Sequence, residues 1–354
     1  MVARMAMLPN QRNPLDTNLP TEQALSAQIK EIAGWVKASG AEVHLTVNSP
    51  NSTIRYIELP NMPLDDIRAA LKLNSAAYLR QSFENYTFDV CPLDAEGAAA
   101  LLSKIRRAKR EHVPAPAHGK IKAMISGIAT AEAVLYFHAA RRAGIKPRSL
   151  QLSAISVINA FEAAYPQVVA KQAVALLDMG FLSSCLTILD QGKPLLTRPV
   201  PIGGKHITEY MAQISSSDFF KMETAKLQGD AGLGEAVARA CVSLVREVRS
   251  SINFFEKNSD QALSKVYLSG ASTRAQAVVD ALSQDIGVAC EGWNPVNGMP
   301  LEAPPEQQEL FAQNQASFVT AIGAARAAAP APAAAVAVSS SAAKTTVQPL
   351  APKT

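Results

Sequence analysis

Residues 173–210 read AVALLDMGFLSSCLTILDQGKPLLTRPVPIGGKHITEY. The pattern predicts three strands, the first ending at Asp178-Met179-Gly180 and the other two flanking the turn Asp190-Gln191-Gly192-Lys193. Gly203-Gly204 then precedes a helical pattern. Glycine turns let backbone N–H groups approach an anion closely, because no Cβ intervenes. Two such turns near one sheet edge indicate a phosphate cradle, although a strand meander with ordinary turns explains the same residues equally well.

A second segment further along the chain also has a glycine turn directly after a predicted strand. The strand-like run Lys265–Ser269 breaks at Gly270 and enters a helical pattern over Thr273–Leu282. A strand–glycine–helix step presents N–H groups at a helix N-terminus, where the helix dipole favours anions. Between the two segments, Glu223 and Lys226 stand at i and i+3 and therefore share one helix face.

In this order, the segments resemble the nucleotide-binding elements of the actin-like ATPase superfamily, and within it the PilM family of type IV pilus assembly and then the FtsA family of cell division. The similarity extends over roughly residues 41–327. The matching motif residues are Asp178, Gly180, Ser183 and Ser184 in the second phosphate motif, Gly203 and Gly204 ending the Arg-x-x-x-x-Gly-Gly segment, Glu223 and Lys226 beside the nucleoside, and Gly270, Ala271 and Ser272 in the adenosine motif. Other similar stretches are Tyr56–Pro60, Ala143–Pro147 and Phe318–Arg326.

The resemblance implies an α/β fold of the actin-like, ribonuclease H-like type, with two domains and an inserted small α+β subdomain. The expected boundaries are the start of the first domain at 1–47, the inserted subdomain at 48–148, a return to the first domain at 149–171, the second domain at 172–305, a C-terminal helix packing back on the first domain at 306–329, and a disordered Ala/Pro tail at 330–354.

The beginning of the chain departs from the family pattern. The family opens with strands that carry an Asp-x-Gly first phosphate motif, whereas this sequence begins MVARMAML and its first glycine is Gly34, inside a helical pattern. Either an N-terminal piece is missing from the sequence, or the protein lacks half of the phosphate clamp.

Other departures argue against catalysis. Bulky Phe181 and Leu182 follow the second phosphate motif, Cys185 takes a polar position, and Ala271 replaces a glycine. The stretch QLSAIS at 151–156, where the family places the acid that orients the attacking water, contains no carboxylate. Phosphoryl transfer to water needs such a positioning group. We therefore expect little or no ATP hydrolysis.

The resemblance implies ATP or ADP with Mg²⁺ as the cofactor, bound weakly or no longer bound, with Asp178 holding the metal through water. Plainer roles remain open for the same residues. Asp178 caps a turn in the simpler interpretation, and Glu223 with Lys226 forms a surface ion pair worth about 0.3 kcal/mol.

For function, the resemblance implies a cytoplasmic scaffold of a type IV pilus-like platform, peripheral to the inner membrane. It would bind the short cytoplasmic N-terminal segment of a single-span inner-membrane partner, through apolar pockets and main-chain hydrogen bonds. Membrane contact would come only through that partner, and homo-oligomers remain open. The alternatives are an active ATPase of pilus or secretion machinery whose first phosphate motif is missing from this sequence, and an FtsA-like division protein, against which the lack of an amphipathic terminal helix argues. A sugar or acyl kinase needs an Asp base, for which we find no candidate.

The composition narrows the class of protein further. The formal net charge of +4 over 354 residues is too small to indicate a nucleic-acid partner. Cys91, Cys185, Cys241 and Cys290 lack metal-ligand spacing and are expected to be reduced thiols. No apolar run is long enough to cross a bilayer. The dense basic run Lys104–Arg110 is either a solvated helix end or a contact for anionic lipid headgroups.

Overall fold

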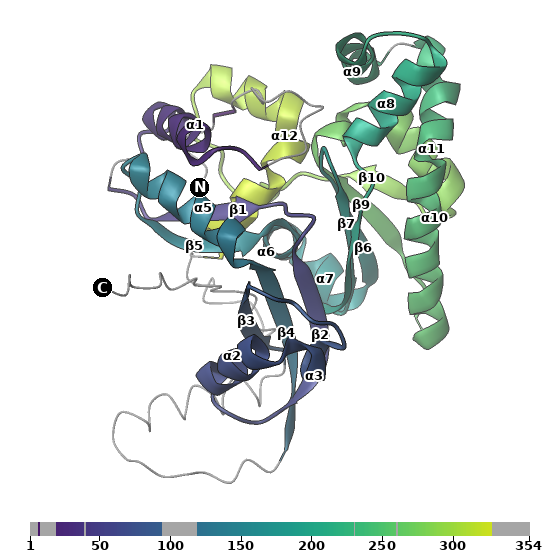
Figure 1. Ribbon diagram of the computed structural model, residues 1–354. Coiled ribbons are helices and arrows are strands. Elements are labelled where there is room, and N and C mark those ends of the chain that lie inside the picture. Colours follow the sequence, from purple (N-terminus) through teal and green to yellow (C-terminus); the bar gives the residue numbers. More distant parts are fainter. Residues whose placement is uncertain are drawn as a thin grey trace. The chain divides into compact units, whose positions relative to one another are not determined.

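The computed structural model describes residues 6–7, 19–38, 40–93, 119–229, 231–259 and 261–327 (Figure 1). They divide into two compact units: the five-stranded unit contains Ser156–Arg326, and the three-stranded unit contains the described part of Asp16–Ile155. The basic run at 104–110 and the predicted tail at 330–354 lie outside the described residues.

The five-stranded unit is built around a mixed sheet of strand order β10-β9-β6-β7-β8. Its strands are β6 (Ala173–Met179), β7 (Ser184–Asp190), β8 (Lys193–Val200), β9 (Lys265–Ser269) and β10 (Cys290–Gly292). β6 pairs antiparallel with β7 and parallel with β9, with Asp178 opposite Ser269 in the parallel register. The ends of β6 and β9, after which the glycine turns follow, therefore lie side by side.

Helices cover both faces of this sheet. They are α6 (Ser153–Ala164), α7 (Pro166–Lys171), α8 (Gly204–Ile214), α9 (Phe219–Gln228), α10 (Gly234–Asn258), α11 (Gln276–Ile286) and α12 (Pro305–Arg326), with 3-10 turns η1 (Ala231–Leu233) and η2 (Ala271–Arg274). In Figure 1, α8, α10 and α11 lie on one side of the strands, and α6 and α7 lie on the other.

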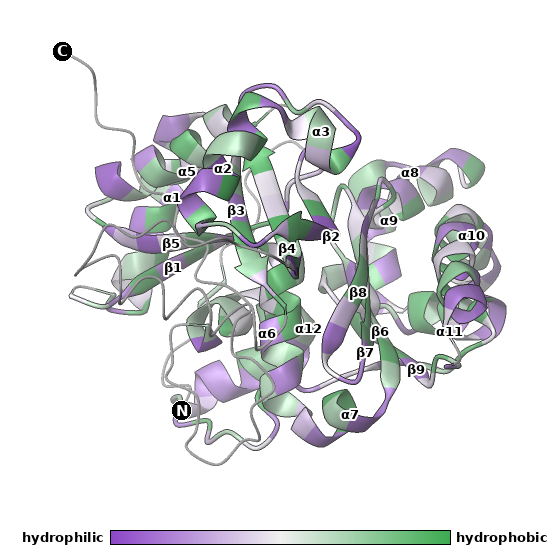
Figure 2. Cartoon of the chain, turned by 90° about the horizontal axis from the view of Figure 1, so that it is seen from below, coloured by the Kyte–Doolittle hydropathy of each residue, from purple (hydrophilic) through white to green (hydrophobic). Residues whose placement is uncertain are grey.

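Strand β6 explains this arrangement, because successive side chains of a strand point to opposite faces. Ala175 and Leu177 pack in the cluster that contains residues of α8, α10 and α11. Val174 and Leu176 pack in the cluster that contains residues of α6, α7 and α12. All four are buried, and β6 is coloured mainly as hydrophobic in Figure 2. Asp178 shares the face of Val174 and Leu176 by the same alternation.

The three-stranded unit holds an antiparallel sheet of order β2-β4-β3 and a parallel pair of β1 with β5. Its elements are α1 (Glu22–Trp35), β1 (Val43–Val47), β2 (Thr53–Pro60), α2 (Leu64–Leu73), α3 (Ser75–Leu79), β3 (Tyr86–Pro92), β4 (Lys120–Ala129), α5 (Thr130–Arg142) and β5 (Pro147–Leu152). Ile67 and Leu71 of α2 pack with Phe88 and Ile125 of the sheet in one buried cluster. Among the described residues, no strand precedes β1.

The α6 face of the five-stranded sheet is rich in aromatic rings. Phe161 lies 4.6 Å from Tyr267 and 5.1 Å from Trp293, measured between ring centroids, and it stacks on Tyr165. Such pairs contribute about 1 kcal/mol each beyond the area they bury. Glu162 follows Phe161 on α6, and burial raises the pKa of its carboxyl to about 7.

This pKa predicts a pH-dependent stability. Because the folded-state pKa of Glu162 lies above its ordinary value of 4.5, its stabilising contribution is complete below pH 4.5 and is lost as the pH rises through about 7. Glu162→Gln should therefore raise the free energy of unfolding at pH 8 by about 2 kcal/mol, and by much less at pH 4.5. Urea unfolding at both pH values measures the effect. The exposed Glu302→Gln is the control, and an equal gain at both pH values would contradict the prediction.

Candidate functional site

The three glycine turns predicted to form the site meet at one end of the five-stranded sheet. A Cβ added to Gly203 would lie 2.6 Å from the carbonyl oxygen of Gly180. A Cβ on Gly204 would collide with the Ser272 hydroxyl, and a Cβ on Gly270 would collide with the Met179 carbonyl. The backbones approach so closely that only glycine fits at these three positions without movement of a neighbour.

Several N–H groups of these turns have partners inside the chain. Gly204 N–H donates to the Gly180 carbonyl at 2.9 Å, and Lys205 N–H donates to the Phe181 carbonyl at 2.9 Å. Gly203 N–H donates to His206 Nδ1 at 3.2 Å. The hydrogen bonds join the second phosphate turn to the start of α8. They also occupy the N–H groups of Gly203, Gly204 and Lys205, so an anion could bind these donors only by displacing them.

The segment after Gly270 differs from the predicted direct entry into a helix. The chain first forms η2, and α11 begins at Gln276, because Ala275 is extended with φ −76° and ψ 108°. Gly270 itself has φ 95° and ψ 156°, and its N–H donates to the Ala316 carbonyl at 2.9 Å. Ala271 is exposed and Ser272 is buried beside Gly204.

Asp178 has a buried carboxyl group with one side-chain hydrogen-bond partner among the described residues. Ser269 Oγ donates to Asp178 Oδ1 at 2.8 Å, across the β6–β9 register. Burial raises the pKa of Asp178, and the Ser269 hydrogen bond offsets part of that rise. Burial, with a smaller contribution from Asp178, raises the pKa of the neighbouring Cys185 thiol to about 12. The described residues contain no group of three His, Cys, Asp or Glu side chains that could hold a metal ion.

The two serines of the second phosphate motif are also buried within the protein. Ser183 and Ser184 are buried, and Ser184 Oγ donates to the Ile202 carbonyl at 2.6 Å. Ser184 thereby ties the start of β7 to the residue before Gly203.

Lys226 is the centre of a buried polar network. Its Nζ donates to Glu223 Oε2 at 2.7 Å, to Thr208 Oγ1 at 2.8 Å and to the Gly204 carbonyl at 3.2 Å. The Thr208 hydroxyl also contacts the Glu223 carboxylate. The Lys226 side chain is 0% exposed, so its three N–H donors are matched by three acceptors inside the chain. Burial lowers the pKa of Lys226, and Glu223 offsets part of that effect.

Sequence reasoning found Glu223 and Lys226 and missed the residues that satisfy them. Thr208 stands four residues after Gly204, so one helical turn of α8 places its hydroxyl beside that carbonyl. Ser269 was part of the predicted strand end, but its bond to Asp178 depends on the pairing of β9 with β6. The i, i+4 spacing was a usable signal for Thr208, whereas the Ser269 contact required the strand register.

Aromatic side chains stand where the family pattern has small residues. Phe181 follows Gly180 and packs edge-on against Phe219, with 6.4 Å between ring centroids. Phe219 in turn packs against Phe220, which is 60% exposed. Phe181, one of the two bulky residues noted after the phosphate turn, therefore contacts the start of α9.

A pocket of about 430 Å³ opens beside the network, still within the five-stranded unit. Its lining includes Leu227, which follows Lys226, and Thr273 and Arg274, which follow Ser272. Trp293 also lines it, and the indole N–H of that buried residue has no hydrogen-bond partner within the described part of the chain. The volume of this pocket falls within the range of small-molecule binding sites. These residues are the ones that could hold a nucleoside.

No helix in the described ranges is long and apolar enough to span a membrane.

Comparison with known proteins identifies the family. The family model described as "Type IV pilus assembly protein PilM" matches residues 2–328. The solved PilM-PilN type IV pilus biogenesis complex is similar over 90% of this chain and 90% of that chain, with 23% identity and a TM-score of 0.72. Both findings confirm the actin-like fold and the family predicted from the motifs.

More distant likenesses are to the ethanolamine utilization protein EutJ from Carboxydothermus hydrogenoformans and to a Bacteroides thetaiotaomicron protein with an actin-like ATPase fold. The first has 19% identity over 55% of this chain and 60% of that chain, with a TM-score of 0.39. The second has 12% identity over 84% and 83%, with a TM-score of 0.40. No curated protein sequence matches the chain. On the match of the family model over residues 2–328, the chain belongs to the PilM family of type IV pilus assembly proteins.

Proposed function

We propose that this protein is a scaffold of a type IV pilus-type assembly platform that captures the short N-terminal segment of a PilN-type inner-membrane partner. The observation that carries the proposal is the similarity to the PilM-PilN complex over 90% of both chains at a TM-score of 0.72. An extended segment of this kind binds through main-chain hydrogen bonds and side-chain pockets. In the proposal, the protein is held at the inner membrane from the cytoplasmic side by its partner.

We further propose that nucleotide binding is weak or lost and that hydrolysis is negligible. The donors of Gly203, Gly204 and Gly270 already have partners, which supports the proposal. Lys226 is fully buried in its own network, and Asp178 is buried against Ser269. A phosphate group would have to replace hydrogen bonds that the chain already makes, so its net gain would be small.

The experiment that tests the scaffold function uses the full chain and a fluorescein-labelled peptide with the N-terminal sequence of the PilN-type protein of the same cell. Fluorescence anisotropy should show saturable binding, and a peptide of the same composition in scrambled order should not bind. If the correctly folded chain shows no saturation up to about 100 μM peptide, the scaffold proposal is wrong.

Nucleotide binding is the second candidate function, favoured by the pocket at Leu227, Thr273 and Arg274. Titration with a fluorescent ATP analogue and Mg²⁺ distinguishes it from the first. We expect a Kd weaker than about 100 μM and no release of phosphate. A micromolar Kd that weakens at least tenfold in Arg274→Ala, but not in the distant control Arg239→Ala, would show that the pocket binds nucleotide.

A further inference from the structure

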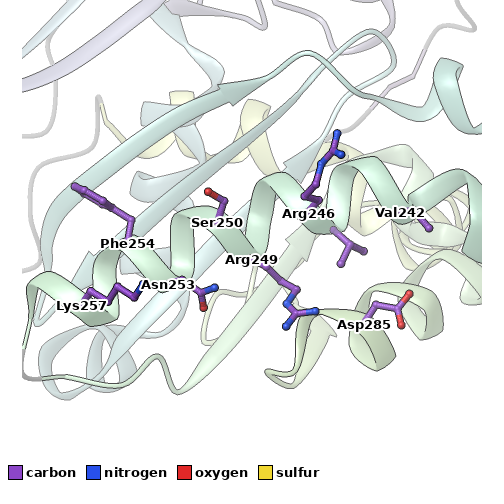
Figure 3. Close-up of a pocket in the computed structure, with 9 residues that line it drawn as sticks. Val242, Arg246, Arg249, Ser250, Asn253, Phe254, Lys257 and Asp285 are labelled. Carbon is purple, nitrogen blue, oxygen red and sulfur yellow. The ribbon is translucent and has the colours of Figure 1, made fainter.

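The outward face of α10 forms a shallow groove with α11, of about 680 Å³ (Figure 3). We call it the α10 groove. Its principal lining residues are Val242, Arg246, Arg249, Phe254, Lys257 and Asp285. In Figure 3, Arg249 of α10 and Asp285 of α11 point toward the space between the two helices. The groove lies within the five-stranded unit, and its lining includes none of the residues of the glycine turns.

The groove follows from the amphipathic sequence of α10. Leu244, Val248, Ile252 and Phe255 are buried and pack in the cluster against the sheet. The opposite face of the same 25-residue helix is left outside, and its polar side chains are exposed. Burial of the inner face anchors the helix, so the outer face is presented on a rigid element.

Within the described residues, the cations of the groove have no ion-pair or hydrogen-bond partner, whereas Arg198 and Arg239 of the same unit do. Arg239 pairs with Glu235 at 2.6 Å, and Arg198 pairs with Glu247 at 2.6 Å. Arg246, Arg249 and Lys257 are exposed, and among the described residues none of the three makes an ion pair or a hydrogen bond. Spacings of three and eight residues bring them onto one broad helix face. Asp285 is the single carboxylate in the lining, which leaves an excess of positive charge.

Apolar surface accompanies this charge. Val242 is 56% exposed and Phe254 is 62% exposed. They are twelve residues apart, which is about 18 Å along a helix. Single exposed apolar residues are common on protein surfaces, but here Val242 precedes the unpaired cations on α10 and Phe254 lies between Arg249 and Lys257. A ligand that covers both must be elongated, partly apolar and negatively charged.

We propose that the α10 groove binds an acidic amphipathic helix of a partner protein. Carboxylates of that helix pair with Arg246, Arg249 and Lys257, and its apolar side chains cover Phe254 and Val242. Arginine suits this task, because its planar guanidinium donates two parallel hydrogen bonds to the oxygens of one carboxylate. Aromatic and arginine side chains also carry much of the free energy at protein interfaces.

The charge pattern favours a protein over a membrane or a nucleic acid. Clusters that hold anionic lipid typically contain about four to eight Lys or Arg residues, and this groove has three cations opposed by Asp285. The surface is also hollowed between two helices, which suits a rod-shaped ligand. The formal net charge of +4 for the whole chain is small for a nucleic-acid partner.

The test uses the full chain and a designed, fluorescein-labelled helical peptide of about 18 residues, or ~27 Å. Glutamates line one face of the peptide at three- and four-residue spacings, and leucines line the adjoining face. A second peptide carries lysine in place of every glutamate. The acidic peptide should bind saturably and more weakly at higher salt, and the lysine peptide should not bind.

Variants of the groove sharpen the test. Arg246→Glu/Arg249→Glu should weaken binding of the acidic peptide at least tenfold, and Phe254→Ala by about tenfold. Lys193→Glu/Lys221→Glu makes the same change in net charge at exposed positions outside the groove, and should alter the Kd less than twofold. Asp285→Asn should strengthen binding about threefold, a gain that damage to folding would not produce.

The outcomes described next would each contradict the proposal that the α10 groove binds an acidic helix. No binding of the acidic peptide, or equal weakening by the two charge-reversed double variants, shows that the groove does not recognise it. If anionic phosphatidylglycerol vesicles are bound instead, and Arg246→Glu/Arg249→Glu abolishes that binding, the groove is a lipid site. If sedimentation shows a dimer that the same variant dissociates, the groove joins two copies of this chain. Binding of the PilN-type peptide should be unchanged in these variants, which separates this proposal from the scaffold function.

Discussion

Replacement of Gly270 by alanine is expected to destabilise the protein by about 3 kcal/mol or more. Two effects add. The backbone at φ 95° and ψ 156° lies in a region that only glycine adopts freely, and occupying it with another residue costs about 1–3 kcal/mol. The new methyl group would also collide with the Met179 carbonyl, which is backbone and cannot rotate away. Chemical unfolding followed by circular dichroism measures the loss.

A second glycine of the same unit separates these two effects. Gly287 also has a positive φ, 80°, but nothing lies within 4 Å of the position of its missing Cβ. Gly287→Ala should therefore cost only about 1 kcal/mol, the conformational part alone. If both variants lose the same stability, the close approach of the β6 end to the Gly270 turn makes no contribution, and the first prediction fails.

Lys226→Met is expected to cost about 3–5 kcal/mol. The substitution removes a fully buried cation from its pair with the partly buried Glu223, and it leaves the Glu223 carboxylate and the Gly204 carbonyl with the Thr208 hydroxyl as their remaining side-chain donor. Removing one member of such a pair is more harmful than removing both. The double variant Glu223→Gln/Lys226→Met should therefore lose less than Lys226→Met alone.

An exposed ion pair provides the control for Lys226. Arg239 and Glu235 are four residues apart on α10, and both are largely exposed. Arg239→Met should change the free energy of unfolding by no more than about 0.5 kcal/mol, because solvent screens exposed pairs. A loss of less than 1 kcal/mol in Lys226→Met would show that the network is as dispensable as a surface pair. The role of Lys226 would then have to be sought in ligand binding.

The predictions for Gly270→Ala and Lys226→Met both test whether the residues around the glycine turns stabilise the chain in the absence of a ligand. If Gly270 and Lys226 stabilise the chain without ligand, the family motifs that contain them have a structural role in this protein. The fluorescent nucleotide titration then reports independently whether any ligand function remains.

Local structure could be predicted wherever short-range patterns dominate. The strand-like run Lys265–Ser269 forms β9 with the predicted bounds. The turn between β7 and β8 has Gln191 and Gly192 at positive φ, as a tight hairpin with glycine requires. The helical pattern predicted after Gly203-Gly204 forms α8, which begins at Gly204. Each of these features depends on residues within one element or one turn.

The entry into α11 shows where short-range patterns fail. Periodicity predicted a helix from Thr273, but α11 begins at Gln276 after the turn η2. The turn is held by contacts far away in the sequence, because Gly270 N–H bonds to Ala316 and Ser272 lies against Gly204. No local signal in residues 270–276 reports these neighbours.

The sequence by itself determined the family, the strand and helix pattern and the three glycine turns, because glycine spacing and hydrophobic alternation are properties of neighbouring residues. The tertiary structure alone decided what those turns do. It placed Lys226 in full burial and directed the N–H groups of Gly204 and Gly270 to carbonyls of the chain itself. It also left Arg246 and Arg249 exposed on the outer face of α10, without a hydrogen-bond or ion-pair partner in the part of the chain that the structure describes. Burial and hydrogen-bond partners depend on strand register and helix packing between distant segments, and a local pattern carries no information about them.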